Sequence, residues 1–242
     1  MSKYQERLNE VYAPLVELSH AKEKLGSRFQ RFSTEVDGPF LIRSPSEYEN
    51  SKRRVIIVGQ ENNGWIGPYQ NFLLGNNDEM IHASLEEYQK FELEKSHATT
   101  FFQTFAEIRY ELNGESAARK SVLWSNLLKF NQGRDPQMIR SDHLNDALAV
   151  QGETFQREIE IFEPEIIIFL TGPYYDEIID RFYPGLKSHQ FGNHSMNTVA
   201  RLDHKDLPDN TYRTYHPNYL RIQPSRTSHC LPTIFDSIQA YN

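Results

Sequence analysis

Four short polar segments carry side chains that are suited to hydrolytic chemistry. They contain Glu61, Asn126, Gly172 and His216, each placed shortly after a run of apolar residues. A carboxylate can position water and accept its proton, and an imidazole can stabilise a leaving group. The amide of Asn126 can recognise a ligand, and the turn at Gly172 can begin a helix. This combination favours hydrolysis, with Glu61 acting on water and His216 on the leaving group.

Each polar segment follows a strand that the sequence predicts. We expect strands at Arg53 to Gly59, Ser121 to Trp124, Glu165 to Leu170 and Thr211 to Tyr215. Their continuous aliphatic runs are typical of parallel strands, which are buried on both faces. In open parallel sheets the ligand site lies beyond the carboxyl ends of the strands. The polar segments are therefore expected at one edge of the sheet.

Helical patterns alternate with these strands. We expect helices at residues 4–25, 84–95, 99–112, 154–162, 173–181 and 231–240, a long loop at 60–78 and an irregular stretch at 126–134. Gly26 suits a helix end, and Pro173 suits a first turn. The alternation indicates one α/β domain over residues 1–242, with a mostly parallel sheet and an N-terminal helical extension to about residue 35.

The composition excludes several classes of protein. The chain has 242 residues, 26 Lys and Arg against 33 Asp and Glu, a net charge of −7 and one cysteine. A single cysteine excludes a disulfide framework and a four-thiolate iron–sulfur cluster, and it favours a reducing compartment. No apolar run approaches the roughly 20 residues of a membrane span, and no signal peptide is recognisable. We expect a cytoplasmic protein, with a nucleoid or nuclear location left open, and no membrane partner.

Metal and nucleotide motifs are missing from the sequence. His189, His194 and His204 are irregularly spaced, and there is no HExxH, GxGxxG or GxxxxGKS/T motif. These patterns supply the ligands of zinc sites and the phosphate-binding loops of nucleotide enzymes. We therefore expect no metal and no cofactor. We also expect the protein to be a monomer.

The order of these segments resembles the uracil-DNA glycosylase superfamily. Gly59-Gln60-Glu61 is similar to the Gly-Gln-Asp-Pro-Tyr turn of the family, and His216-Pro217-Asn218-Tyr219-Leu220 is similar to its His-Pro-Ser-Pro-Leu loop. Residues 122–126 resemble the strand that ends in the base-reading Asn, and residues 166–172 resemble the strand that ends in Gly. The resemblance covers residues 53–220. It implies a three-layer α/β/α sandwich with a short, mostly parallel central sheet, while the lone Cys230 sets the chain apart from members that carry an iron–sulfur cluster.

The resemblance also implies a monofunctional DNA glycosylase. Such an enzyme flips a nucleotide out of the base stack and hydrolyses its N-glycosidic bond. Glu61 would position water and stabilise the sugar cation, and His216 would stabilise the departing base anion. Asn126 and the backbone of Gln60 would contact the base, and Leu220 would fill the gap that the flipped nucleotide leaves.

One departure from the family concerns base selectivity. Asn62 and Asn63 stand where the family has Pro-Tyr, and that Tyr excludes thymine in relatives. We expect Asn63 to line a wider pocket that admits a 5-modified pyrimidine, or a pocket that Trp65 or Tyr69 closes. Phe72 is the expected stacking residue for the base, with Trp65 and Tyr69 as alternatives.

Structural explanations compete with each of these assignments. Glu61 can cap a turn, His216 can pack in the core, and Asn126 can satisfy buried backbone groups. Leu220 and the three aromatic residues can be ordinary core residues. The alternative functions are a catalytically silent protein of the same fold that binds nucleic acid or a nucleobase, and a small-molecule hydrolase that acts on nucleosides.

The acidic total is compatible with a local basic face. Residues 210–242 contain Arg213, Arg221 and Arg226 against Asp236 as their one acidic residue. Hydroxyl groups such as that of Ser225 bind phosphate oxygens, and a helix N-terminus after Gly172 could hold another phosphate. The residues expected to contact DNA are Leu220, Arg221, Ser225, Arg226 and Gly172.

This basic face yields a first prediction. Arg226→Ala should weaken DNA binding and flatten its dependence on salt, because each cation on a phosphate releases counterions when DNA binds. Fluorescence anisotropy of a labelled oligonucleotide at several salt concentrations measures both quantities. Unchanged affinity and an unchanged salt slope would count against this face.

Overall fold

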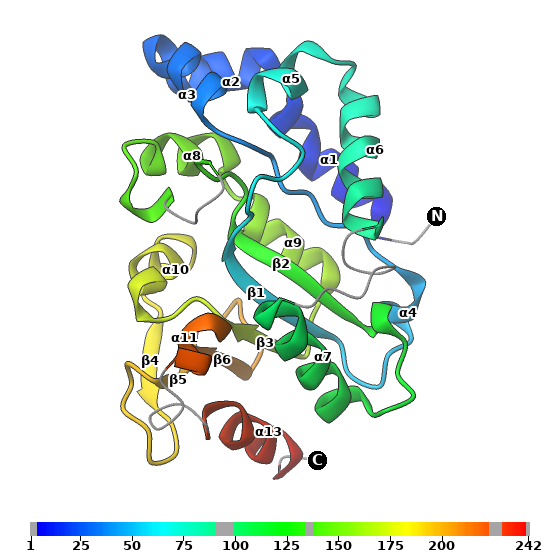
Figure 1. Ribbon diagram of the computed structural model, residues 1–242, viewed down its shortest axis with the longest axis vertical. Helices are drawn as coiled ribbons and strands as arrows, with labels where there is room; N and C mark the ends of the chain where they lie inside the picture. Colours follow the sequence, from blue (N-terminus) through cyan, green and yellow to red (C-terminus); the bar gives the residue numbers. More distant parts are fainter. Residues whose placement is uncertain (1–3, 91–98, 134–137, 223–228, 241–242) are drawn as a thin grey trace. The chain divides into compact units, whose positions relative to one another are not determined.

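The computed structural model describes residues 4–90, 99–133, 138–222 and 229–240, and it divides the chain into two compact units (Figure 1). Unit 1 comprises Met1–Ser44, Gln60–Lys95 and Asn126–Phe162, and unit 2 comprises Pro45–Gly59, Ser96–Ser125 and Glu163–Asn242. The chain passes from unit 2 into unit 1 near the ends of two strands. The predicted site residues are therefore divided between the two units.

A six-stranded sheet has the order β2-β1-β3-β6-β5-β4. The strands are β1 Val55–Glu61, β2 Val122–Leu128, β3 Ile166–Phe169, β4 Lys187–Gln190, β5 Val199–Asp203 and β6 Asn210–Thr214. Strands β1 and β6 both run parallel to β3, whereas β5 runs antiparallel to β6 and β4 antiparallel to β5. The predicted α/β fold class with its mostly parallel sheet is confirmed.

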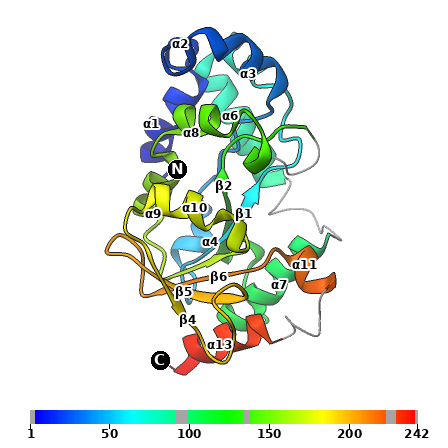
Figure 2. The same ribbon diagram turned by 90° about the vertical axis from the view of Figure 1, so that its left-hand side faces the viewer.

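Helices cover both faces of the sheet in unit 2 (Figure 2). They are α4 Ser46–Glu49, α7 Thr100–Asn113, α10 Asp176–Phe182, α11 Pro217–Ile222 and α13 Cys230–Ala240. Successive residues of a strand point to opposite faces. Tyr212 of β6 hydrogen-bonds Ser237 of α13, while the next residue, Arg213, binds Asp176 of α10. Helices α10 and α13 therefore lie on opposite faces, in the three-layer arrangement that the resemblance implies.

Unit 1 is mainly helical. Its helices are α1 Gln5–Val16, α2 Leu18–Leu25, α3 Phe29–Glu35, α5 Tyr69–Leu74, α6 Asn77–Tyr88, α8 Leu144–Gln151 and α9 Thr154–Phe162. Leu8, Tyr12 and Leu15 are buried along α1, with the spacing of one helical face. Gly26 ends α2 with a φ of +55°, a conformation that favours glycine. In the described part of the chain no helix is long and apolar enough to cross a membrane.

The predicted helices and strands agree best with the structure where the apolar pattern of the sequence is strong. The helix at 154–162 is α9, and the strand at 165–170 is β3. The helix expected at 4–25 is interrupted at Glu17, which has an extended backbone. The helix at 99–112 is α7, and the last helix is α13.

Three expectations about irregular segments are wrong in part. The loop predicted at 60–78 contains α5, and α6 starts at Asn77, earlier than residue 84. Tyr69 and Phe72 lie three positions apart on the buried face of α5, a pattern that the surrounding Asn and Gly residues obscured. The stretch at 126–134 begins with the last residues of β2. Residues 91–95 of the predicted second helix lie outside the described residues.

A fully buried ion pair lies inside unit 1. Lys129 Nζ is 2.5 Å from Glu158 Oε2, and both side chains are completely shielded from solvent. The Tyr12 hydroxyl donates to the other Glu158 oxygen at 2.9 Å. The ammonium also lies over the rings of Phe40 and Phe155, at 5.7 and 5.8 Å from their centroids. This network joins α1, α9 and the segment that follows β2.

Burial sets the electrostatics of this network. It lowers the pKa of Lys129 despite the opposing effect of Glu158. Burial, together with the nearby carboxylate of Glu158, raises the pKa of Tyr12 well above its ordinary value. Desolvation of two charges costs nearly as much as their attraction returns, so the pair fixes one arrangement of the helices more than it adds stability.

We predict that Lys129→Met will lower the free energy of unfolding by about 3–5 kcal/mol, because it leaves the Glu158 carboxylate buried without its cation. The double variant Lys129→Met/Glu158→Met should recover most of that loss. Urea denaturation measures both. Arg157→Met, which removes an exposed ion pair with Glu160, is the matched control and should change stability little. Equal losses in the single and double variants would contradict this account.

Candidate functional site

Each of the two predicted catalytic residues lies at or just beyond the carboxyl end of a strand. Glu61 is the last residue of β1, and His216 lies two residues beyond the end of β6. Both strands run parallel to β3, β1 along Val55–Val58 and β6 along Asn210–Arg213. Glu61 belongs to unit 1 and His216 to unit 2, and each has its own surroundings.

His216 is held by an aromatic ring and a backbone amide. Its imidazole stacks on Phe101 with 5.9 Å between ring centroids and 25° between planes. The backbone N–H of Asn218 donates to His216 Nδ1 at 3.3 Å. Burial lowers the pKa of the His216 imidazole from 6.5 to about 4, because a charged ring would lose its hydration.

These contacts define the hydrogen-bonding character of His216. At neutral pH the ring carries no charge, so one nitrogen bears a hydrogen and the other accepts. Since Nδ1 accepts from Asn218, the hydrogen is on Nε2. The Nε2–H group is therefore a neutral donor at the carboxyl edge of the sheet. A donor of this kind stabilises an oxyanion on a leaving group without a proton having to move first.

Glu61 is anchored through both carboxylate oxygens. The side chain is buried, with 8% of its surface exposed. Both oxygens accept from the backbone N–H of Met138, each at 3.1 Å, at the start of the short helical turn Met138–Arg140. A carboxylate has two acceptor oxygens, and both of them take part in this contact. The contact fixes the orientation of the carboxylate.

Comparison with protein-family models and with curated proteins finds no match to this chain.

The predicted polar base-binding residues lie within β1 and β2 or in the loop after β1. Gln60 is half-buried in β1, and Asn63 is exposed in the loop that follows. Asn126 is inside β2 and not after it, and only 1% of its surface is exposed. The aliphatic pattern ended at Trp124, which is why the strand was expected to stop there.

The three predicted aromatic residues pack inside unit 1. Trp65 donates through Nε1 to Ser84 and packs against Phe40. The Tyr69 hydroxyl donates to the Leu15 carbonyl at 2.8 Å, and Phe72 has 1% of its surface exposed. These contacts are those of core residues, which was the competing explanation. A role for any of the three in binding a base stays a prediction.

The segment after His216 is a helix and not a loop. Pro217 begins α11, a position where its missing N–H costs nothing, and Leu220 is half-buried within it. Arg221 belongs to the same helix, but its side chain lies outside the described part of the chain. Ser225 and Arg226 are also outside the described residues.

The expected role of Arg213 in a basic face is wrong. Its side chain is 1% exposed and forms a two-pronged ion pair with Asp176, at 2.9 and 2.8 Å. The same guanidinium also donates a hydrogen bond to the Asn197 carbonyl. Arg213 therefore ties β6 to α10 and is not available to a phosphate. A count of charged residues along the sequence cannot distinguish buried arginines from exposed ones.

Gly172 is positioned by a close contact and not by a long helix. Its φ is +72°, and a Cβ there would lie 3.3 Å from the Tyr215 ring. The helix expected from Pro173 starts as a single turn, Pro173–Tyr175, before α10. Binding of a phosphate at this point stays a prediction.

Sequence reasoning missed several aromatic residues near His216. Phe101 of α7 stacks on the imidazole, 115 positions earlier in the chain. Tyr215 and Tyr219 flank the histidine and pack together with 4.2 Å between centroids, while Tyr174 is 71% exposed. Tyr215 and Tyr219 are close to His216 in the sequence, so an aromatic environment for the histidine could have been predicted from them. The contact with Phe101 has no signature in the local sequence.

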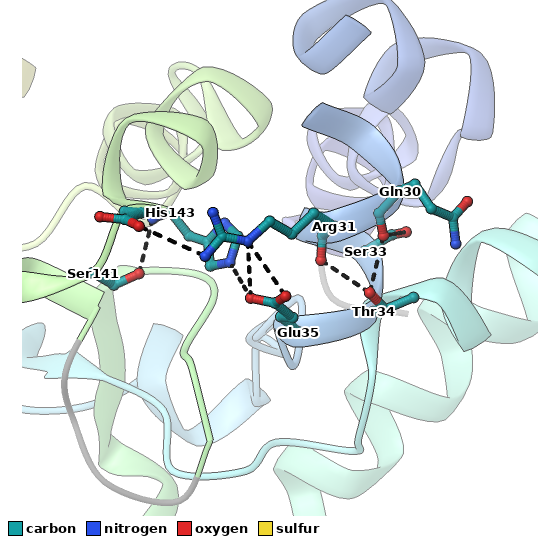
Figure 3. Close-up of polar contacts among 8 residues, drawn as sticks. Gln30, Arg31, Ser33, Thr34, Glu35, Ser141 and His143 are labelled. Atoms are coloured by element: carbon teal, nitrogen blue, oxygen red, sulfur yellow. Dashed lines mark hydrogen bonds and ion pairs between the residues drawn. The ribbon is translucent and has the colours of Figure 1, made fainter. Parts of the chain in front are cut away.

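A second polar cluster in unit 1 joins α3 to the segment before α8 (Figure 3). The Glu35 carboxylate lies between Arg31, at 3.3 Å, and Nε2 of His143, at 2.9 Å. The hydrogen bond from His143 lowers the pKa of Glu35. The His143 ring is buried against Phe32, so this cluster acts as a clamp between helices. Within the described ranges, no group of three or more His, Cys, Asp or Glu residues is arranged to hold a metal ion.

The surroundings of His216 yield a prediction for its titration. Phe101→Ala should raise the pKa of His216 from about 4 towards 6.5, because water then reaches the ring. In the wild type, the stability gained from a neutral His216 is complete above pH 6.5 and is lost as the pH falls towards 4. NMR titration of the imidazole measures the shift. Phe102→Ala, whose ring packs on Trp124 and Phe105, is the control; a pKa that stays near 4 in Phe101→Ala would overturn the explanation.

Proposed function

We propose that this protein is a monofunctional DNA glycosylase that hydrolyses the N-glycosidic bond of a flipped uracil-like or 5-modified pyrimidine. The observation that carries the proposal is the neutral Nε2–H donor of His216. A departing pyrimidine carries its negative charge on ring nitrogen and carbonyl oxygen, and a hydrogen bond to that oxygen stabilises it. A base excised in this way serves base-excision repair of damaged DNA or the removal of modified bases.

The proposed reaction needs water and no cofactor. The bond between C1′ of the sugar and the base nitrogen breaks, and its electron pair leaves with the base. His216 Nε2–H donates to the carbonyl oxygen of that anion. Water adds through its oxygen to C1′, and its proton passes to the Glu61 carboxylate and then to solvent. The base anion takes up a proton from solvent, so the products are the free base and an abasic sugar.

The environment of Glu61 supports its part in this reaction. Its carboxylate is buried and is oriented by the Met138 N–H, and a carboxylate can accept a proton from water. A negative charge also stabilises the positive charge that develops on the sugar. We propose further that the buried amide of Asn126 and the backbone of Gln60 bind the base, and that Leu220 occupies the gap in the duplex.

The replacement of Pro-Tyr by Asn62 and Asn63 supports a base with a 5-substituent. A tyrosine in that position crowds the 5-position of a pyrimidine, and asparagine is smaller. We therefore propose that thymine-sized bases, including 5-hydroxymethyluracil, enter the pocket along with uracil.

One observation favours a second candidate, a protein of the same fold that binds nucleic acid or a nucleobase without cleaving it. Both oxygens of Glu61 already serve Met138, which is a structural task. In that case the carboxylate would shape the loop and have no water to activate.

An excision assay separates the two candidates. Oligonucleotides that carry uracil, thymine or 5-hydroxymethyluracil, single- and double-stranded, are incubated with the protein and then treated with alkali. We expect strand scission only after alkali, with a loss of about 100-fold or more in Glu61→Gln and in His216→Ala. Glu61→Gln keeps an oxygen for the Met138 N–H, so it removes the charge and spares the anchor.

Matched variants control for nonspecific effects. His189→Ala, on the exposed strand β4, and Glu79→Gln, in the first turn of α6, should keep wild-type activity. Activity that persists in Glu61→Gln would assign the carboxylate to structure alone. Intact DNA across the whole panel, together with measurable binding, would replace the glycosylase by the binding protein. Excision of uracil but not of the 5-substituted bases would refute the wider pocket.

A further inference from the structure

Asn62, the residue after Glu61, is buried without a hydrogen-bond partner. Its side chain has 1% of its surface exposed, and neither Oδ1 nor Nδ2 forms a hydrogen bond with any residue that the structure describes. A carboxamide offers two N–H donors and two acceptor lone pairs. Nearly all buried polar side chains in folded proteins have a partner, so a fully unpaired amide requires an explanation.

Local structure does not supply that partner. Asparagine in a turn usually bonds to the backbone two residues further on, which satisfies its carbonyl oxygen. The loop after β1 instead contains Ile66 with a φ of +43°, a strained conformation for a β-branched residue. Gly64 and Gly67 also have positive φ values, 69° and 89°. An unsatisfied amide and a strained backbone within five residues indicate a segment shaped for a ligand and not for stability.

We propose that the Asn62 carboxamide is a specificity-determining group that hydrogen-bonds the imide edge of the bound pyrimidine. The inference rests on the proposed function and adds a residue to it. Uracil and thymine present an N–H next to a carbonyl oxygen, and a carboxamide presents a C=O next to an NH₂ group. Its acceptor matches the ring N–H, and its donor matches the carbonyl. The match requires both atoms of the amide to be available, as they are in Asn62.

The proposal makes opposite demands on stability and on activity. Asn62→Leu replaces the amide by an apolar group of similar shape, so it should raise Tm by about 2–4 °C if the amide is unpaired in the free protein. The same change should lower excision of uracil roughly tenfold or more, because the bonds to the base are lost. Asn71→Leu, on the exposed face of α5, is the matched control and should do neither.

A second variant tests the match to the base edge. Asn62→Asp offers two acceptors and no donor, so it should discriminate against the carbonyl of uracil and favour the amino group of cytosine. The measured quantity is the ratio of excision rates for uracil and cytosine in otherwise identical oligonucleotides. A ratio unchanged from wild type in Asn62→Asp would overturn the assignment to this edge.

The outcomes separate this inference from the proposed function. Wild-type excision with equal activity in Asn62→Leu would refute the role of Asn62 and leave the glycosylase intact. If no DNA is cleaved, thermal shifts with free uracil, thymine and cytosine decide: a shift in wild type that Asn62→Leu abolishes supports the site, and no shift refutes it. A lower Tm in Asn62→Leu would show that the amide is already hydrogen-bonded in the free protein, to nothing more than a bound water. That result would also refute the proposed role of Asn62.

Discussion

The parallel pairing of β1 and β6 with β3 is the constraint on which the candidate site depends. Val55 to Val58 pair with Ile166 to Phe169, and those residues pair on their other side with Asn210 to Arg213. The register matters because a slip of one residue turns every side chain to the opposite face. Such a slip in β6 would turn Arg213 away from Asp176, at a high cost for a buried guanidinium. The ion pair therefore protects the register that delivers His216 to the sheet edge.

Charge in this protein is used internally as well as at its surface. Lys129 and Arg213 are among its largest fully buried side chains, and each faces a carboxylate. Both ion pairs join elements that are distant in the sequence. Charge-assisted hydrogen bonds fix the relative orientation of two groups more strictly than a hydrophobic contact of similar size does. Each pair is neutral and leaves the net charge of −7 unchanged, but neither of the two buried cations can contribute to a nucleic-acid surface.

Sequence patterning was sufficient for the buried strands and insufficient for the edge of the sheet. The Val-Ile-Ile-Val and Ile-Ile-Ile-Phe runs could be assigned because strands buried on both faces are apolar throughout. Strand β4, Lys187–Gln190, is exposed along its whole length and has no apolar residue to mark it. The positions of Glu61 and His216 followed from the strands before them. The stacking of Phe101 on His216 did not, since it depends on how α7 packs in unit 2.

The loop after β1 is the place where local rules of protein structure are broken together. Two polar side chains elsewhere in unit 1 show the usual pattern: Asn76 caps α6, and buried Glu158 has both a cation and a hydroxyl as partners. Asn62 leaves its amide unpaired, and Ile66 adopts a backbone conformation that costs energy. Sequences of natural proteins are otherwise consistent across these levels, and exceptions concentrate at functional sites. Glu61 is the last residue of β1, directly before this loop, so the strained backbone and the unpaired amide lie next to the acidic group of the proposed site.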